Sequence, residues 1–348
     1  MQRRPDASAA DPRAVVPPPC PPRRPAAPAA RRQGVPFRLA ALGVGLVLLA
    51  GCGSQSDIPP APTVAPTAAG SGSTVGTADA GTAFGVLKEL DDAWKAKDCA
   101  KVLFLTTAAE NELGGRGCEA TRNGRPVPSR PAYGDTDFFL PDRPQEHPWF
   151  VALARDPDPV YVVLVQEDSR WRVAYGPLKL LTAPPKLDAD VTTRVVPTED
   201  PDDGVRARLV PQKHLAFLSD RAGLTGIRFA SGDPMRSLLT ELVKKPTTVR
   251  PDRLSSEIQL IPDDTRALAL AGGGALVFHS FKIFYTQKTT AGKLSHPLFG
   301  TTQAKAFTDS STPKSLHATE IVQLATKVTP DGKLTTIASS RALADLTP

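Results

Sequence analysis

The sequence contains little cysteine, few aromatic residues and no apolar run long enough to cross a membrane as an ordinary helix. Its 348 residues include four Cys and three Trp, and Phe, Trp and Tyr together account for 6% of the chain. The apolar run at residues 39–49 would form a helix about 16 Å long, roughly half the thickness of a hydrocarbon core. This length excludes a transmembrane helix here and is typical of the apolar core of a signal peptide.

Most of the chain also lacks an excess of either charge. The formal net charge is +6 at pH 7, from 42 basic and 36 acidic residues. Residues 1–51 contain eight of the basic and two of the acidic residues, which leaves 34 of each sign in residues 52–348. Because that region is neutral, only a local basic patch could bind nucleic acid, and we expect no nucleic-acid partner.

Motifs of common catalytic and metal sites are missing as well, including Gly-x-Ser-x-Gly, His-Glu-x-x-His and the phosphate-binding loop. Residues 311–314 match the Ser-x-x-Lys motif of penicillin-binding enzymes by coincidence, since its Ser-Asp-Asn and Lys-Thr-Gly partners are absent. The acidic run 199–203 fails as a calcium loop, because Pro201 and Val210 would occupy ligand positions, and a solvated linker is the better interpretation. We predict no catalytic residue, no metal site and no cofactor.

What is present begins with an export signal. Three Arg residues precede the apolar run, and Leu49-Ala50-Gly51-Cys52 follows it. This arrangement resembles bacterial lipoprotein precursors, of an uncharacterised actinobacterial type, in which Leu, two small residues and Cys form the lipobox. The resemblance implies cleavage between Gly51 and Cys52. It also implies acylation of the Cys52 thiol and of the new amino group. More than one acyl chain is needed to anchor a protein stably on a bilayer. We predict residues 1–51 as a signal peptide and a lipid anchor at the outer face of the cell membrane.

Residues 52–81 predict the lipidated Cys52 and a disordered tether. Beyond Cys52 this segment consists mostly of Pro, Ala, Gly, Ser and Thr and has almost no large apolar residue, so it cannot bury enough apolar surface to fold. A coil of this length would hold the folded region about 30 Å from the lipid. A recognition segment around residues 59–62 is the alternative to a plain spacer.

The remaining cysteines form an even pair. Cys20 lies in the predicted signal peptide and Cys52 is the lipid site, so Cys99 and Cys118 remain. In an exported protein this predicts a disulfide, which would add about 3 kcal/mol to the free energy of unfolding by closing a loop. The alternatives, a metal-binding pair or a reactive thiol, lack a supporting residue pattern.

Two units, each with helices followed by antiparallel strands, are predicted after the tether, and together they indicate an α+β fold. The first unit, residues 82–182, has apolar residues at helical spacing, a second helix capped by Asp98, a loop over 114–133 and a strand hairpin. Residues 183–204 are predicted as a linker. The second unit, residues 205–348, has helices that begin near Pro211 and Asp233. Its predicted strands are 256–261, 266–271, 275–286, 319–328 and 333–340.

The first unit resembles a known superfamily. Ala93-Trp94 and Asp98 lie around the first predicted turn, Thr106-Thr107 ends the second helix, and a Trp-Arg-Val strand closes the hairpin. These features resemble nuclear-transport-factor-2-like domains. The resemblance implies a curved sheet around helices that forms a cone-shaped pocket, and it leaves the activity open because enzymes and binding modules share that fold.

His279 is the candidate pocket residue. Alternation places it on one face of the strand 275–286, together with Val277, Phe281, Ile283 and Tyr285. On a pocket wall it could bind a ligand or transfer a proton, whereas a lone His on an apolar face is more often a hydrogen-bonded core residue. Weaker candidates at the expected pocket mouth of the first unit are Tyr133, Asp135 and Asp137.

These patterns predict a non-enzymatic module that binds a small apolar ligand or a protein of the cell envelope. Apolar residues at 138–140 and 149–150 could form a partner surface, although core packing is the better interpretation. The alternative is an envelope hydrolase or isomerase with a pocket acid or His. A His–carboxylate pair in a deep pocket would favour the enzyme, and a shallow, apolar or filled cone would favour binding.

Overall fold

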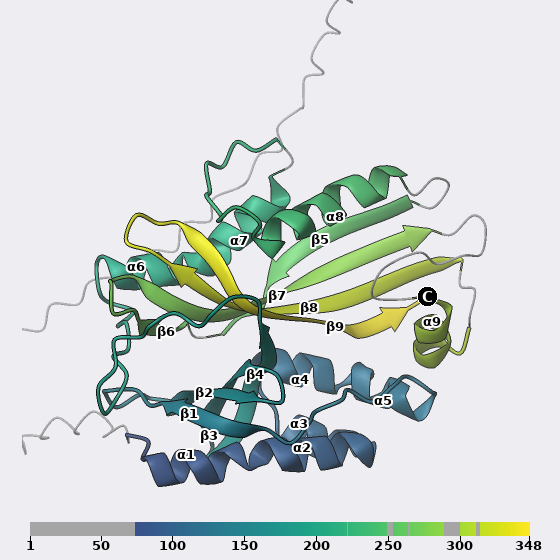
Figure 1. Cartoon of the computed structure of the whole chain (residues 1–348). Coiled ribbons are helices and arrows are strands. Elements are labelled where there is room, and N and C mark those ends of the chain that lie inside the picture. Colours follow the sequence, from purple (N-terminus) through teal and green to yellow (C-terminus); the bar gives the residue numbers. More distant parts are fainter. Residues whose placement is uncertain (1–73, 221, 249–252, 264, 289–299, 311–313) are drawn as a thin grey trace, which may run out of the picture. The chain divides into compact units, whose positions relative to one another are not determined.

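The computed structural model describes residues 74–220, 222–248, 253–263, 265–288, 300–310 and 314–348 (Figure 1). The predicted signal peptide, the lipobox residues Gly51 and Cys52, and most of the predicted tether lie outside these ranges, as do residues 311–313 of the Ser-x-x-Lys match. The described part combines helices with a large antiparallel sheet, which confirms the α+β fold class. None of the described helices is long and apolar enough to cross a membrane.

The described strands form one antiparallel sheet of nine strands in the order β1-β2-β3-β4-β9-β8-β7-β5, with β6 also paired to β7. Their bounds are β1 (Gly134–Phe139), β2 (Trp149–Asp156), β3 (Val160–Glu167), β4 (Arg170–Leu180), β5 (Arg253–Leu260), β6 (Arg266–Ala269), β7 (Ala275–Lys288), β8 (Ser315–Val328) and β9 (Leu334–Thr347). β4 and β9 join through the pairs Lys179–Ser339 and Leu180–Ala338. The sheet is therefore continuous across the predicted linker, while the division into two domains stays a prediction.

The described helices are α1 (Thr77–Phe84), α2 (Val86–Lys95), α3 (Cys99–Phe104), α4 (Ala108–Gly114), α5 (Arg116–Arg122), α6 (Asp203–Arg208), α7 (Val210–Ser219), α8 (Pro234–Thr248) and α9 (Thr301–Thr308). α1 begins inside the segment predicted as a tether, because Ala80 and Ala83 give it a small buried face. The predicted loop over 114–133 is wrong in its first half. It contains α5, which buries Cys118 and its neighbours despite its Gly and Arg content.

Buried apolar residues fill the spaces between layers. Phe150, Val162 and Leu164 of β2 and β3 pack with apolar residues of α1–α3. On the opposite face of β3, Tyr161 meets Phe278 of β7 with ring centroids 5.7 Å apart. Because both faces of β3 are covered, its sequence is a continuous apolar run without alternation.

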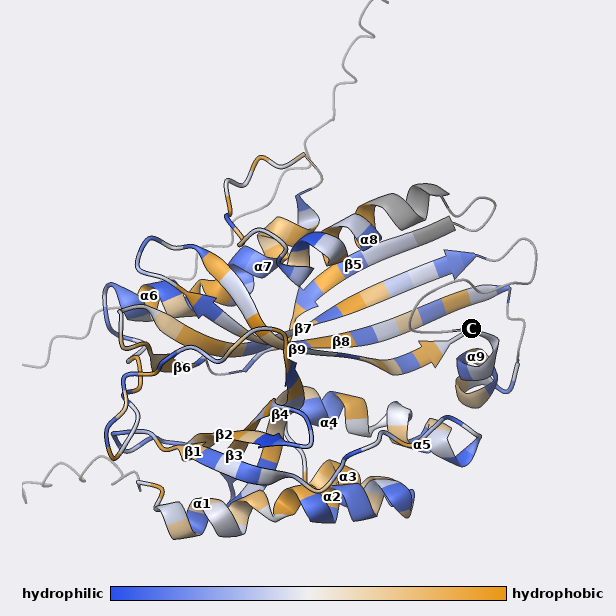
Figure 2. Ribbon diagram, viewed as in Figure 1, coloured by the Kyte–Doolittle hydropathy of each residue, from blue (hydrophilic) through white to orange (hydrophobic). Residues whose placement is uncertain are grey.

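The outer face of β5 and β7 packs against α7 and α8 (Figure 1). β7 is buried on both faces over its first seven residues and alternates between buried and partly exposed residues toward Lys288. Figure 2 shows the same change as a hydrophobic beginning and a hydrophilic end of this strand. The alternation predicted around His279 therefore holds, with Val277, Phe281, Ile283 and Tyr285 in the cluster beneath the helices.

Candidate ligand-binding site

A cavity of about 190 Å³ lies beside the joint between β4 and β9. Its walls come from α2, α4, the segment between α5 and β1, β4 and β9. The lining residues are Trp94, Glu110, Leu113, Arg125, Pro128, Ser129, Arg130, Pro177, Ser340 and Ala342. An engineered cavity of about 150 Å³ binds benzene, so this space suits a ligand of similar or slightly larger size.

A buried ion pair forms one wall of the cavity. Arg130 Nη2 donates a hydrogen bond to Glu110 Oε2 at 3.0 Å, and the side chains of Arg130 and Glu110 are only 7% and 3% exposed. Burial raises the pKa of Glu110, while the charge of Arg130 and a hydrogen bond from Gln323 oppose that shift. The Arg130 guanidinium also lies over the Trp94 ring, 5.5 Å from its centroid, which adds a cation–π contact.

Gln323 on β8 holds the Glu110 carboxylate in place. Its Nε2 donates to Glu110 Oε1 at 2.7 Å, and its Oε1 accepts a hydrogen bond from the Gly176 N–H at 2.8 Å. Gly176 has a φ of +109°, and a Cβ there would lie 2.6 Å from the Tyr161 carbonyl oxygen, so the position requires Gly. These contacts fix the ion pair to both β4 and β8.

Arg130 retains donors that the described protein does not use. No described residue accepts a hydrogen bond from Arg130 Nε or Nη1, or from Trp94 Nε1, although all three atoms are buried. Leaving a buried donor without an acceptor costs about 1–3 kcal/mol. Such donors beside a cavity call for an explanation, and an acceptor on a bound molecule provides one.

A second arginine lines the same cavity. Arg125 donates hydrogen bonds to the carbonyl oxygens of Gly117 and Leu343 at 2.8 and 2.7 Å. Burial lowers the pKa of Arg125 to about 10. The charged lining residues are thus two arginines and one glutamate, so the cavity carries a net charge of +1 when Glu110 is ionised.

Arg341 on β9 shows the contrasting case of an arginine whose guanidinium is shared between two protein carboxylates. It donates to Glu320 on β8 and to both oxygens of Glu241 on α8, the latter at 3.2 Å each. Tyr285 donates its hydroxyl hydrogen to Glu320 Oε2 at 2.8 Å. This network joins neighbouring elements and has the properties of a structural ion pair.

His279, the pocket residue predicted from sequence, is buried and is absent from the lining of the Arg130 cavity. Its Nε2 lies 3.2 Å from Thr326 Oγ1, and its ring centroid lies 4.5 Å from that of His214 on α7. Burial lowers the pKa of His214 to about 4 and the pKa of His279 well below its ordinary value. The geometry is that of two neutral rings in a packed core, which favours the core interpretation over the functional one.

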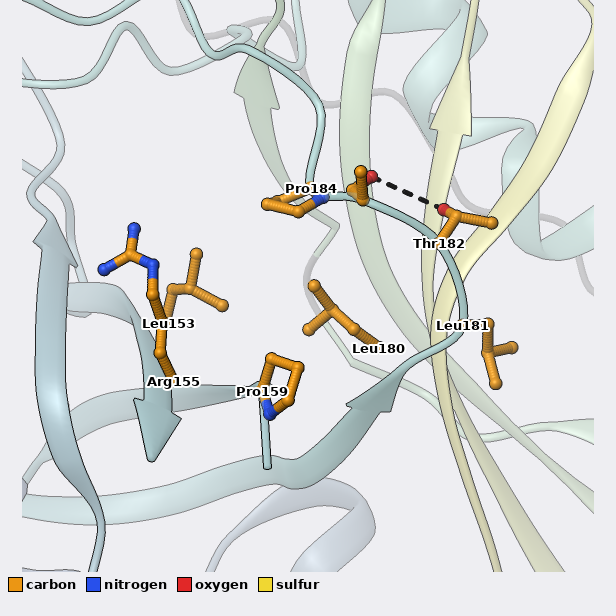
Figure 3. A pocket seen from close by; sticks show the side chains of 8 residues that line it. Leu153, Arg155, Pro159, Leu180, Leu181, Thr182 and Pro184 are labelled. Atoms are coloured by element: carbon orange, nitrogen blue, oxygen red, sulfur yellow. Dashed lines mark hydrogen bonds between the residues drawn. The ribbon is translucent and has the colours of Figure 1, made fainter. Parts of the chain in front are cut away.

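A larger and more apolar cavity, of about 440 Å³, lies between β2, the end of β4 and residues 181–184. Figure 3 shows Leu153 and Arg155 across from Leu180 and Pro184. The Arg155 guanidinium already donates to Asp137 on β1, one of the predicted pocket-mouth residues. This cavity offers apolar surface for the predicted small apolar ligand, and its charged group is already paired.

The remaining predictions concern the cysteine pair, the apolar residues 149–150 and a metal site. Cys99 and Cys118 form a disulfide that joins α3 to α5, with Cα atoms 5.6 Å apart. Trp149 and Phe150 are buried and belong to the core. Within the described ranges, no group of three or more His, Cys, Asp or Glu side chains could hold a metal ion.

The sequence patterns did not identify Glu110, Arg130 and Gln323, because these residues come from three separate segments and form no motif. One signal was available at Glu110. It shares the buried face of α4 with Ala109 and Leu113, so a charged residue stands on an otherwise apolar helix face. A carboxylate in that position requires a buried partner.

The fold and the cavity define an α+β protein with a partly open site lined by two arginines and one glutamate. Residues 109–345 match the family described as Domain of unknown function (DUF8094), and the chain belongs to that family. The matched region runs across the predicted linker and includes every lining residue of the Arg130 cavity except Trp94. No curated protein and no solved structure matches the chain.

Proposed function

We propose that the protein is an exported lipoprotein, anchored by acyl chains on Cys52 at the outer face of the cell membrane, whose folded region binds a small molecule. The order of basic residues, apolar run, small pair and Cys52 supports the anchor. A disulfide between Cys99 and Cys118 suits an oxidising compartment.

One observation carries the binding role: Arg130 lines a cavity, and two of its buried donor atoms have no acceptor among the described residues. The proposal treats the space between α2, α4 and the sheet as the cone-shaped pocket that the resemblance to nuclear-transport-factor-2-like domains implies.

An envelope protein is the alternative partner. The exposed Leu103 and Phe104, at the end of α3, are the apolar residues that favour it.

The alternative function, a hydrolase or isomerase, requires a group that transfers a proton. Glu110 is the carboxyl group among the residues that line the Arg130 cavity. Both of its oxygens accept hydrogen bonds from the protein, from Arg130 and from Gln323. This arrangement favours a fixed ion pair over proton transfer, and it favours binding over catalysis.

The anchor is tested by the mass of the protein extracted from membranes and of its N-terminal tryptic peptide. We expect a peptide that begins at Cys52 and carries the added mass of a diacylglycerol, with or without a further acyl chain. A Cys52→Ser variant is the control and should lose both the lipid and the membrane association. An unmodified chain that retains residues 1–51 would overturn the lipoprotein proposal.

A further inference from the structure

The Arg130 cavity contains enough information to define the chemistry of its ligand, provided that the proposed binding function is correct. We infer that the cavity binds a small organic monocarboxylate, whose charged end accepts hydrogen bonds from Arg130 and whose apolar body lies against Trp94 and Leu113. Trp94, Glu110 and Leu113 are buried, and the Arg130 side chain, only 7% exposed, is held in position by its ion pair with Glu110.

The charge of the cavity selects an anion. Glu110 accepts a hydrogen bond from Arg130 Nη2, and the buried Nε and Nη1 donors have no acceptor among the described residues. Arg125 contributes another positive charge, and its donors reach carbonyl oxygens of Gly117 and Leu343. A cation would meet two guanidinium groups, and a neutral ligand would leave the net charge of +1 uncompensated.

The net charge of the cavity also favours a ligand with one negative charge over a ligand with two. A monocarboxylate brings the lining to neutrality while Glu110 stays ionised, whereas a phosphate dianion would exceed the positive charge available and approach the Glu110 carboxylate. A carboxylate also matches the planar guanidinium geometry. The volume of about 190 Å³ and the apolar side chains leave room for an aromatic ring or a short aliphatic chain.

The test is isothermal titration calorimetry of the purified full chain, with whichever N-terminus the mass measurement shows. Benzoate is the probe, and benzamide and benzylammonium are its neutral and cationic counterparts of nearly the same shape. We expect benzoate to bind with a dissociation constant of about 1 mM. Benzamide, benzylammonium and inorganic phosphate should each bind at least about tenfold more weakly.

Variants assign the binding to the cavity. Arg130→Gln should weaken benzoate binding at least about tenfold. Arg130→Gln alone leaves Glu110 buried without its cationic partner. The double variant Glu110→Gln with Arg130→Gln removes both charges and should lose benzoate binding equally. Glu110→Gln alone raises the charge of the cavity and should tighten benzoate binding severalfold. Arg155→Gln, at the apolar cavity of Figure 3, is the matched control and should leave benzoate binding unchanged.

The outcomes separate this inference from the function on which it rests. Equal affinities for benzoate and benzamide, both lost in the double variant, would overturn the anion preference and leave a small-molecule binding site. Absence of binding by every probe would overturn the inference about this cavity. The proposed membrane anchor would be unaffected, because the mass measurement tests it independently. Benzoate binding that survives in the double variant would also overturn it.

Discussion

His279, Thr326 and His214 form a short hydrogen-bonded chain in which each proton can be placed. His214 Nδ1 lies 2.9 Å from the Val210 carbonyl oxygen, so this nitrogen carries the proton and Nε2 is an acceptor. The Thr326 hydroxyl then donates to His214 Nε2 and accepts from His279 Nε2–H. His279 Nδ1 is left as a buried nitrogen without a partner among the described residues. Protonation of His214 Nε2 would remove the acceptor of the Thr326 hydroxyl, and protonation of His279 would place an N–H without a partner among the described residues.

This chain predicts a specific loss of stability in acid. The pKa of His214 in the folded protein is about 4, and that of His279 is also far below 6.5, so the unfolded state takes up the protons first. The stabilisation is present above pH 6.5 and is lost as the pH falls from 6.5 toward 4. For His214 alone the loss reaches about 3 kcal/mol at pH 4. Urea unfolding at a series of pH values measures it.

The matched variants isolate this effect from other titrating groups. Burial raises the pKa values of Glu110 and Glu320, and raised carboxyl pKa values act in the opposite direction, so only a difference between variants is informative. His279→Leu should remove the contribution of His279 and leave that of His214, so the dependence between pH 6.5 and 4 should become less steep. The exposed His317→Gln should leave it unchanged. A slope that is the same in His279→Leu and in the wild type would contradict the assignment.

At the scale of elements, the disulfide ties the beginning of α3 to the middle of α5. Both sulfur-bearing residues are buried, and Cys118 is completely so. α3 and α5 have six and seven residues, too few to be stable as isolated helices. Their position therefore depends on packing and on the covalent link between them.

The double variant Cys99→Ser with Cys118→Ser should lower the free energy of unfolding by about 3 kcal/mol, the contribution that closing a loop of this length makes. The measurement is the urea midpoint with and without dithiothreitol. The wild type should shift with the reductant, and the double variant should not. A wild-type midpoint that dithiothreitol leaves unchanged would mean that the link contributes nothing to stability.

The sequence predicted those helices and strands whose local residue pattern is sufficient to specify the secondary structure. The hairpin of β3 and β4, the long strand β7 and the turn between β8 and β9 follow from apolar runs, alternation and a Pro-Asp-Gly turn. β1, β2, α5 and α9 were missed because their local sequence patterns are weak, and tertiary contacts compensate for that weakness. α5, for example, follows Gly114-Gly115 and is held by the disulfide and by contacts with α9 and β9.

The candidate site could not be predicted in the same way. Glu110, Arg130 and Gln323 meet only because β4 and β8 come together at Gly176, 147 positions from Gln323 in the sequence. Hydrophobic periodicity gives no information on which segments of the chain come into contact in the folded protein. For His279, the sequence predicted the strand and the face of the strand but not the contact. Its partner His214 lies on a helix from a distant segment.

At the scale of the whole described region, the two predicted units share one sheet and one apolar cluster. Tyr161 packs on Phe278, and Gln323 hydrogen-bonds both Gly176 and Glu110. Contacts of this kind make each unit part of the other's core. We therefore expect the region to unfold as one cooperative unit.

The sequence provides a probe for this prediction. All three Trp residues, Trp94, Trp149 and Trp171, lie in the first predicted unit, whereas the backbone signal in far-ultraviolet circular dichroism comes from both. Urea transitions followed by Trp fluorescence and by circular dichroism should coincide in midpoint and slope. Two separated midpoints would show that residues 82–182 fold independently, as the division into two domains predicts.

β1 forms one end of the strand order and pairs with β2 on one side only among the described strands. An open strand edge can align with the same edge of another copy and start aggregation. Asp135 and Asp137 place exposed carboxylates along this edge, and Asp135 has a φ of +45° that interrupts regular strand geometry. Arg155 on β2 forms ion pairs with both carboxylates, so an approaching copy would meet charged groups and an irregular backbone at this edge. At the β1 end of the sheet, these features therefore act against edge-to-edge pairing of two copies.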